Sequence, residues 1–212
     1  GWEDRPRGAG KADTKDFLRL GYVPHVHAAD GGLYNFSASH TMEYSYSAYA
    51  VAQRARALGK EADYDRLMGL SHGWENLYDS TCNFVRPRYD DGTFVENFDP
   101  LEVWRGFQEG NAWQYTFYVP HDPQAMIAGA VLNFQMKPMI AKVGADVFNA
   151  RLDSIFTLSQ RRIFSGGTEV EAFAGLRTLY NQGNEPSLHI SWLFNESGRP
   201  SRTQHWVRAI LN

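Results

Sequence analysis

The stretch SHTMEYSYSAYAVAQRARALGK, from Ser39 to Lys60, shows the clearest structural pattern in the chain. Its apolar residues recur at alternating steps of four and three, which is the spacing of one face of an α-helix. The residues of this face are Tyr44, Ala48, Val51, Ala55 and Leu58. Arg54 and Arg56 fall outside the face, and Gly59 is a typical helix stop. The stretch therefore predicts one long helix over residues 39–59.

The rest of the chain repeats a rhythm of helix, long loop and helix. A second helical stretch follows Lys60 and resumes near Trp74, so an antiparallel helix pair is expected. Strand-like alternation is almost absent, which favours an all-α chain. Helix pairs of this kind can build a bundle, a solenoid or a toroid, and periodicity leaves the three open. Further helices are expected from Asp122 to Phe134, over 137–143, from Asp146 after a break at Gly144, over 186–195 and over 200–211.

One segment interrupts the helical rhythm. Between Asn83 and Pro100 the chain reads RPRYDDGTFVENFDP over most of its length, and its prolines exclude a long helix. The Asp91-Gly92 pair is typical of a tight turn. A turn or a short hairpin is therefore predicted here.

Composition limits the classes of protein that the chain can belong to. Its 212 residues, 43% of them hydrophobic, fit a single domain over residues 1–212. The net charge is -3 and the 21 Lys and Arg are scattered, so nucleic acid is not an expected partner. Cys82 is the sole cysteine, and no apolar run approaches the roughly 20 residues that cross a bilayer. Aromatic residues make up 14%, as in proteins that stack on sugars, although a Trp-rich core gives the same count.

Glu109 is the strongest candidate for an acid that carries chemistry. It begins the run EGNAWQYTFYVPHD, in which Trp113, Tyr115 and Phe117 follow closely. A carboxyl group pressed against aromatic rings is desolvated and can hold a proton near neutral pH, as a general acid requires. The alternative is a first-turn acid that offsets the exposed amides of a helix start.

A second run, NQGNEPSLH from Asn181 to His189, gathers oxygen donors in a loop before a helix start. Gln182, Asn184 and Glu185 carry the hard oxygens that calcium prefers, although a capped helix start explains them equally. His189 is a candidate contact for a polar ligand or a packing residue. Outside these runs, Glu43 and Arg86 are candidate ligand contacts, each with an ordinary alternative as a helix-start acid or an exposed base.

Taken together, these stretches resemble the catalytic region of glycoside hydrolase family 92, the calcium-dependent exo-α-mannosidases. The resemblance runs from about Gly21 to the last residue, and the combination of EGNAWQY, VPHD and GNEP is its most specific part. The motifs that carry it are GYVPHV at Gly21, the Ser39 stretch quoted above, NLYD at Asn76, FVRPR at Phe84, FDP at Phe98, EGNAWQYTFYVPHD at Glu109, GNEPSLHISWLFN at Gly183 and TQHWVR at Thr203.

The resemblance implies an (α/α)6 toroid, incomplete in this chain, preceded in the complete protein by a β-sandwich domain. It implies hydrolysis of terminal α-linked mannose from glycans with inversion at the anomeric carbon, and so a role in carbohydrate metabolism and N-glycan degradation. Family members are mostly exported bacterial proteins, so a periplasmic or extracellular, secreted protein is expected. A mannose-containing glycan and the remainder of the same polypeptide are the expected partners.

The resemblance also implies roles for single residues. Glu109 is expected to protonate the glycosidic oxygen. Calcium is expected to bind at Gln182, Asn184 and Glu185 and to hold the sugar O2 and O3, which favours a flattened ring. The residues expected to bind substrate are Trp113, Gln114, His121, Asp122, Glu43, Arg86 and His189.

Two departures from the family pattern bear on function. The first helix of the family reads T-L-E-Y-A-Y-D-D, and here Ser47 and Ala48 occupy the two Asp positions. An inverting enzyme also needs a second carboxylate, roughly 6.5–9.5 Å from the first, to activate water. The family places this base in a G-N-D-D motif beyond the TQHWVR helix, so we expect the chain to be an inactive piece of a longer enzyme. The alternatives are a non-catalytic helical sugar-binding module and another α/α-toroid carbohydrate enzyme.

Overall fold

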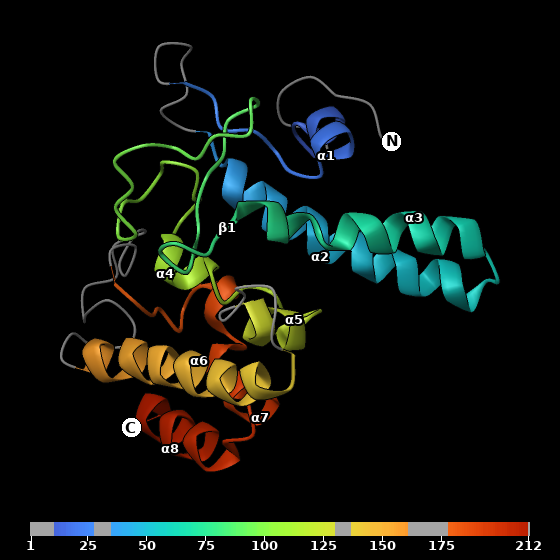
Figure 1. The fold of residues 1–212 in the computed structure, drawn as a ribbon. Helices are drawn as coiled ribbons and strands as arrows, with labels where there is room; N and C mark the ends of the chain where they lie inside the picture. The colour runs from blue at the N-terminus through green and yellow to red at the C-terminus, as the bar shows by residue number, and fades with distance from the viewer. Residues whose placement is uncertain (1–10, 28–34, 130–136, 161–177, 212) are drawn as a thin grey trace. The chain divides into compact units, whose positions relative to one another are not determined.

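The computed structural model describes residues 11–27, 35–129, 137–160 and 178–211 (Figure 1). Helices dominate this part of the chain, which confirms the expected mainly helical class for the described residues. Two strands of two residues each, β1 (Tyr78–Asp79) and β2 (Phe84–Val85), pair in one small sheet. The chain divides into two compact units. The first is Gly1–Asp79, Val85–Asp99 and Trp104–Gln108, and the second is Ser80–Phe84, Pro100–Val103 and Glu109–Asn212.

The first unit is built on the predicted helix pair. Helices α2 (Ser37–Ala57) and α3 (Glu61–Ser71) lie side by side and bury Ala52, Ala55 and Leu67 between them (Figure 1). The α2 helix ends because Gly59 is left-handed, with φ 67°. The amides of Gly59 and Lys60 then bond back to the last carbonyls of the helix. The predicted pair and its glycine stop are therefore confirmed.

Two short helices, α1 and η3, also belong to the first unit, and α1 was not predicted. Helix α1 (Thr14–Leu20) packs Phe17 edge-on against Tyr44 of α2, with 5.5 Å between ring centroids. The stretch after α3 resumes as the 3-10 helix η3 (Gly73–Leu77) rather than as an α-helix. A Cβ at Gly73 would lie 2.5 Å from the Gly21 carbonyl oxygen. The start of η3 therefore packs too closely against the Gly21 backbone for any residue but glycine at position 73.

The segment with the Asp91-Gly92 pair forms the predicted hairpin. Arg88 and Phe94 pair as an isolated antiparallel bridge, and Gly92 turns the chain with φ 87°. The Asp91 carboxylate accepts hydrogen bonds from the amide and the hydroxyl of Thr93, which closes the turn.

The second unit consists of short helical turns around two longer helices. Its elements are α4 (Ala112–Tyr115), α5 (Pro123–Gly129), α6 (Lys137–Gln160), η4 (Glu185–Ser187), η5 (Ile190–Trp192), α7 (Leu193–Glu196) and α8 (Pro200–Leu211). The predicted starts at Asp122 and Pro200 are confirmed, because Asp122 caps α5 by accepting from the Ala125 amide. The predicted continuation of this helix over residues 130–134 lies outside the described residues.

Two helix predictions in this unit were wrong. Helix α6 runs unbroken through Gly144, because one glycine costs a helix only about 1 kcal/mol relative to alanine, too little to end it. Residues 186–195 form 3-10 turns and a short α-turn rather than one helix. Ser187, Ile190 and Leu193 are buried at intervals of three residues, which matches the tighter 3-10 turn.

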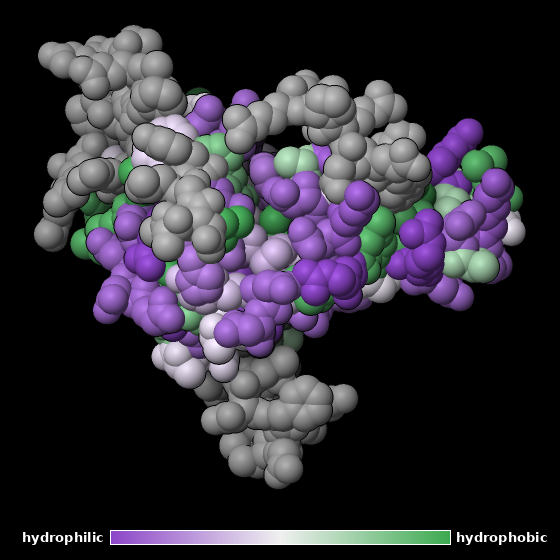
Figure 2. All heavy atoms as spheres, turned by 90° about the horizontal axis from the view of Figure 1, so that it is seen from above, coloured by the Kyte–Doolittle hydropathy of each residue, from purple (hydrophilic) through white to green (hydrophobic). Residues whose placement is uncertain are grey.

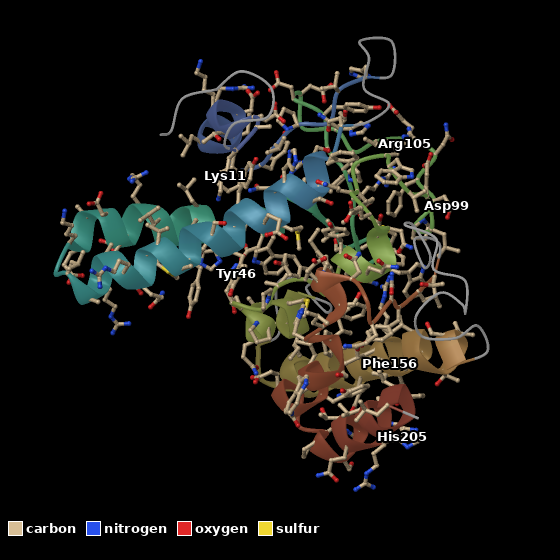
Figure 3. The ribbon with its side chains drawn as sticks, turned by 180° about the vertical axis from the view of Figure 1, so that it is seen from behind. Lys11, Tyr46, Asp99, Arg105, Phe156 and His205 are labelled. Carbon is tan, nitrogen blue, oxygen red and sulfur yellow. The ribbon has the colours of Figure 1, made fainter. Side chains whose placement is uncertain are left out.

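Phe156 of α6 is the centre of the core of the second unit (Figure 3). Its ring stacks on Trp206 of α8 at 5.2 Å and meets Tyr180 at 4.7 Å and Phe194 at 6.1 Å. Aromatic pairs at these distances contribute beyond the area they bury. The aromatic richness of the sequence therefore serves a core in this unit.

The described surface is largely polar. On the face in Figure 2, hydrophilic residues predominate and apolar residues stand between them in small groups. Exposed large apolar side chains are spread over separate elements, among them Leu18 on α1, Val51 on α2 and Trp192 in η5. Among the described helices, none combines the length and the apolar character needed to cross a bilayer.

Candidate active site

Glu109 lies in a tight turn immediately before α4. Its backbone is left-handed, with φ 52°, which an L-residue adopts at a cost in free energy. The Glu109 side chain is exposed, whereas Gly110 behind it is buried. The desolvation against aromatic rings that the sequence suggested is therefore not present in the described residues. Instead, the carboxylate is open to a ligand that approaches from solvent.

Asn111 fixes the position of this turn on α4. Its Oδ1 accepts hydrogen bonds from the amides of Trp113 and Gln114, at 3.0 and 3.3 Å, and so caps the helix. Its Nδ2 donates to the Thr178 carbonyl at 2.9 Å. Asn111 was not predicted as a site residue, although an Asn just before a helical run is a recognised cap signal.

A chain of carboxamides connects the two runs on which the resemblance rests. Gln114, fully buried, donates from Nε2 to the Thr178 carbonyl at 3.0 Å. Its Oε1 faces Nδ2 of Asn184 at 3.5 Å, and the same Nδ2 donates to the Glu109 carbonyl at 2.6 Å. A Cβ at Gly110 would lie 2.9 Å from Gln114 Oε1, so a side chain there would have to displace the Gln114 carboxamide. Both ends of the Gln114 carboxamide therefore face protein partners, and its predicted role in substrate binding stays a prediction.

Trp113 is half-buried in an aromatic and cationic cluster. Its ring meets Phe84 edge-to-face at 4.8 Å between centroids. The guanidinium of Arg151 lies over both rings, 3.9 Å from the centre of Phe84 and 5.1 Å from that of Trp113. Neither Phe84 nor Arg151 was predicted as part of a site, because their relation to Trp113 exists only in the folded chain.

The predicted contacts His189 and Asp122 both have structural partners. His189 Nε2 donates to the Phe117 carbonyl at 2.8 Å, and its ring meets Tyr118 edge-on. Burial lowers the pKa of the His189 imidazole, while the bond to the carbonyl acts in the opposite sense. Asp122 caps α5, and His121 beside it is half-buried.

The three predicted calcium ligands have different surroundings in the described part of the chain. The Gln182 Oε1 accepts from the hydroxyl of Tyr180, and burial raises the pKa of that phenol, which keeps its proton. Asn184 turns its nitrogen toward Glu109, and Glu185 is exposed. No group of three or more His, Cys, Asp or Glu among residues 11–27, 35–129, 137–160 and 178–211 is placed to hold a metal ion. Gln182, Asn184 and Glu185 alone would not supply the roughly six to eight oxygens that calcium takes, so their role as calcium ligands stays a prediction.

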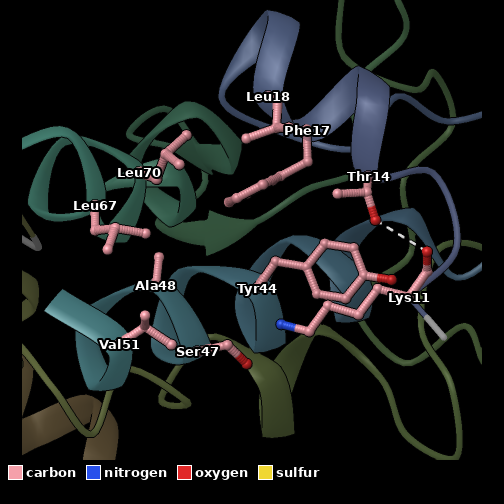
Figure 4. A pocket seen from close by; sticks show the side chains of 10 residues that line it. All are labelled: Lys11, Thr14, Phe17, Leu18, Tyr44, Ser47, Ala48, Val51, Leu67 and Leu70. Atoms are coloured by element: carbon pink, nitrogen blue, oxygen red, sulfur yellow. Dashed lines mark hydrogen bonds between the residues drawn. The ribbon is translucent and has the colours of Figure 1, made fainter. Parts of the chain in front are cut away.

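Glu43 and Arg86 belong to the first unit. Arg86 bonds to the Asp79 carboxylate at 2.9 Å and to the Val95 carbonyl, so its guanidinium is engaged in structural contacts. Glu43 is half-buried on α2. Neither lines the apolar pocket between α1, α2 and α3 (Figure 4). Ser47 and Ala48, at the positions where the family pattern has Asp, do line this pocket.

Comparisons with known proteins identify relatives of the whole chain. The family described as glycosyl hydrolase family 92 catalytic domain matches residues 2–212. A family GH92 α-mannosidase of Bacteroides thetaiotaomicron is 31% identical, with a TM-score of 0.73, over 96% of this chain and 23% of its own. Its complex with mannoimidazole gives 30% identity and a TM-score of 0.74 over 96% and 25%.

Two further relatives extend this comparison. A GH92 inverting mannosidase of the same bacterium has a TM-score of 0.75 at 23% identity, over 98% of this chain and 27% of its own, and shows the shared fold. An uncharacterized secreted glycosidase of Arthroderma benhamiae is 27% identical over 91% of this chain and 24% of its own length. The chain thus spans about a quarter of the proteins it matches. By its match over residues 2–212, the chain belongs to glycosyl hydrolase family 92, as a part of the catalytic domain.

Proposed function

We propose that the natural polypeptide that contains this chain hydrolyses terminal α-linked mannose, with Glu109 as the general acid. Family membership and the names of the solved relatives support the reaction class. The observation that carries the role of Glu109 is its place in the turn before α4, where its carboxylate is exposed while its own carbonyl is held by Asn184 at 2.6 Å. A proton donor must be reachable by the substrate and fixed relative to it. We propose that the bound substrate and the remainder of the polypeptide supply the desolvation that a general acid also requires.

The proposed chemistry is protonation of the leaving glycosidic oxygen by Glu109 as the bond to the anomeric carbon breaks. Inversion requires water to attack the opposite face of the ring, activated by a second carboxylate roughly 6.5–9.5 Å away. We assign this base to no residue of the chain and propose that another part of the same polypeptide supplies it. The (α/α)6 toroid, and a single domain over residues 1–212, are proposed as the frame that brings the two carboxylates together.

Of the predicted substrate contacts, Trp113 has the arrangement best suited to a sugar. Its ring is half-buried, so one part is packed and another is accessible, and Phe84 and Arg151 restrain it. A restrained ring of this kind stacks on a sugar face with little loss of conformational entropy. His121, Asp122, His189, Glu43 and Arg86 remain proposed contacts, each of which needs its own test.

Calcium dependence remains a separate proposal, and we derive no step through the metal. Glu185 offers an exposed carboxylate and Asn184 bonds Glu109 through its nitrogen rather than its oxygen, but the Gln182 oxygen accepts from Tyr180, so further oxygen donors would have to complete the site. Activity that disappears with a chelator and returns with added calcium would support the proposal. Full activity in excess chelator would refute it.

Hydrolysis of aryl α-mannosides tests the proposed reaction. The natural polypeptide is assayed with a good leaving group, 2,4-dinitrophenol, and a poor one, phenol, beside its Glu109→Gln variant. Loss of a general acid is expected to cost about 10²–10⁴-fold in rate on the phenyl substrate and far less on the dinitrophenyl one. Proton NMR of the first sugar released reports inversion or retention. A polypeptide that binds mannose and cleaves neither substrate would instead be a sugar-binding module.

Export from the cell and action on N-glycans are the remaining parts of the proposal. The fungal relative is named as a secreted protein, which supports export. Fractionation of the source cells, with an antibody against this chain, locates the protein. Release of mannose from intact N-glycans separates N-glycan degradation from action on other mannosides.

A further inference from the structure

We infer that Asn184 is a positioning residue for Glu109: its carboxamide nitrogen holds the Glu109 backbone, and Gln114 fixes the direction in which that nitrogen points. The inference rests on the proposed role of Glu109 as the acid. It assigns Asn184 a task other than the metal ligation that the resemblance implies, and it assigns Gln114 a task other than substrate binding.

The turn at Glu109 needs an external restraint. A left-handed backbone, with φ 52°, is unfavourable for a residue that carries a Cβ. The 2.6 Å bond from Asn184 Nδ2 to the Glu109 carbonyl supplies one restraint, and the cap formed by Asn111 two residues later supplies another. With the backbone held on both sides, the carboxyl group has only its own side-chain torsions left. The acid is thereby presented from one place.

The direction of the Asn184 carboxamide follows from its neighbours. Gln114 donates from Nε2 to the Thr178 carbonyl, which leaves its Oε1 to face Asn184. Asn184 therefore meets two oxygens, those of Gln114 and of the Glu109 backbone, and only its nitrogen is a donor to them. Both carboxamides are buried, so a reversed orientation would leave oxygen against oxygen without water to relieve it.

The isosteric change Asn184→Asp separates the two roles. A metal ligand acts through its oxygen, and the charge that an aspartate adds at a calcium ligand would raise calcium affinity above that of the parent. A positioning donor acts through its N–H, which the aspartate lacks, and the new oxygen would repel the Glu109 carbonyl. Gln114→Glu removes the donor to Thr178 in the same way. Asn195→Asp, on an exposed residue of α7, introduces the same charge away from the network and is the matched control.

The natural polypeptide and these variants are assayed on phenyl and 2,4-dinitrophenyl α-mannosides, with kcat and KM determined separately. We expect Asn184→Asp to lower kcat on the phenyl substrate by about 10–100-fold, because small displacements of a catalytic group have effects of this size. The loss on the dinitrophenyl substrate and the change in KM are expected to be small. Gln114→Glu is expected to show the same dependence on the leaving group with a smaller loss. Asn195→Asp should match the parent.

Calcium titration of Asn184→Asp by calorimetry gives a readout apart from activity. Calcium affinity equal to that of the parent, together with the loss on the poor leaving group, supports the inference. Full activity, or an equal loss on both substrates, overturns it. If Asn184→Asp does not fold, the uncharged Asn184→Ser takes its place and must show the same signature. If Glu109→Gln itself shows no dependence on the leaving group, the proposed function fails and this inference with it.

Discussion

The guanidinium of Arg151 lies 3.9 Å above the centre of the Phe84 ring, and its Nη1 donates to the Cys82 carbonyl at 3.4 Å. Trp113 meets the same guanidinium at 5.1 Å. Arg151 of α6 therefore contacts both the segment that ends at Phe84 and helix α4, which follows Glu109. Arginine suits this place, because its planar group stacks on rings and still donates at its edge.

The change Arg151→Met tests the energetic weight of this contact. Methionine keeps most of the length and the apolar contact but removes the charge and the donors. We expect the free energy of unfolding to fall by about 1–2 kcal/mol, since cation–π contacts that are partly desolvated reach this range. Urea unfolding followed by circular dichroism measures it. Arg208→Met, on an exposed residue of α8, is the control and should stay within about 0.5 kcal/mol of the parent.

Asp153 and Asp146 of α6 form a natural pair for a second test. Asp153 Oδ1 accepts from the buried Trp206 indole at 2.7 Å and from Arg202 at 2.9 and 2.5 Å. Asp146 bonds only to Arg199 among the partners in the described chain, at 3.0 Å, and both side chains are exposed.

Asp153→Ala is expected to cost about 1–3 kcal/mol in the free energy of unfolding, because it leaves the Trp206 N–H buried without its acceptor. Asp146→Ala is expected to cost less than about 1 kcal/mol, as exposed ion pairs contribute little. Equal losses in urea unfolding of the two variants would show that burial of the indole does not set the difference.

The elements that the sequence predicted correctly are those whose signal is local. The α2 helix is indicated by a regular apolar face and a glycine stop, and the start of α5 is indicated by an Asp-Pro pair. Helix α1 was missed because its seven residues are too few to show a period, and it is held by the packing of Phe17 on Tyr44. The break at Gly144 was wrong because the preference of one residue is weak against the rest of a long helix.

The same difference between local signals and contacts made only on folding applies to the candidate site. The runs around Glu109 and Asn184 were both singled out, and the fold brings them within a hydrogen bond of each other. The sequence could not predict the roles of Gln114 and Asn184, because each side-chain carboxamide is both a hydrogen-bond donor and an acceptor. The Thr178 carbonyl, from a segment far along the chain, decides which end of Gln114 faces Asn184. Arg151 was missed for the same reason, since only folding places it over Trp113.

Gly106 and Gly59 allow the cost of a left-handed backbone to be separated from the cost of a steric clash. Both are left-handed, with φ 90° and 67°. A Cβ at Gly106 would lie 2.3 Å from Pro87 Cγ, whereas a Cβ at Gly59 would meet nothing within 4 Å. Gly59→Ala should therefore cost only the backbone strain, about 1–2 kcal/mol. Gly106→Ala should cost clearly more, as a lower urea midpoint or as insoluble protein, and equal midpoints would contradict the clash.

His25 gives the protein a predictable response to acid. Its imidazole is 7% exposed, and Nδ1 lies 3.2 Å from the buried Ser37 hydroxyl. Burial, with a smaller effect of Arg105, lowers the pKa of His25 to about 4. Between about pH 6.5, where an unfolded histidine titrates, and pH 4, only the unfolded chain takes up this proton.

The stability that His25 contributes is therefore complete above about pH 6.5 and is lost as the pH falls toward 4. We expect the melting temperature of the parent to drop over this window and that of His25→Gln to drop less, even though the variant is less stable at pH 7.5. The test compares the drop in melting temperature between the parent and His25→Gln, because carboxylates also begin to titrate near pH 4 and affect both proteins. His205→Gln, on an exposed histidine of α8, should follow the parent. If His25→Gln and the parent lose stability in parallel, the buried imidazole is not the source of the acid response.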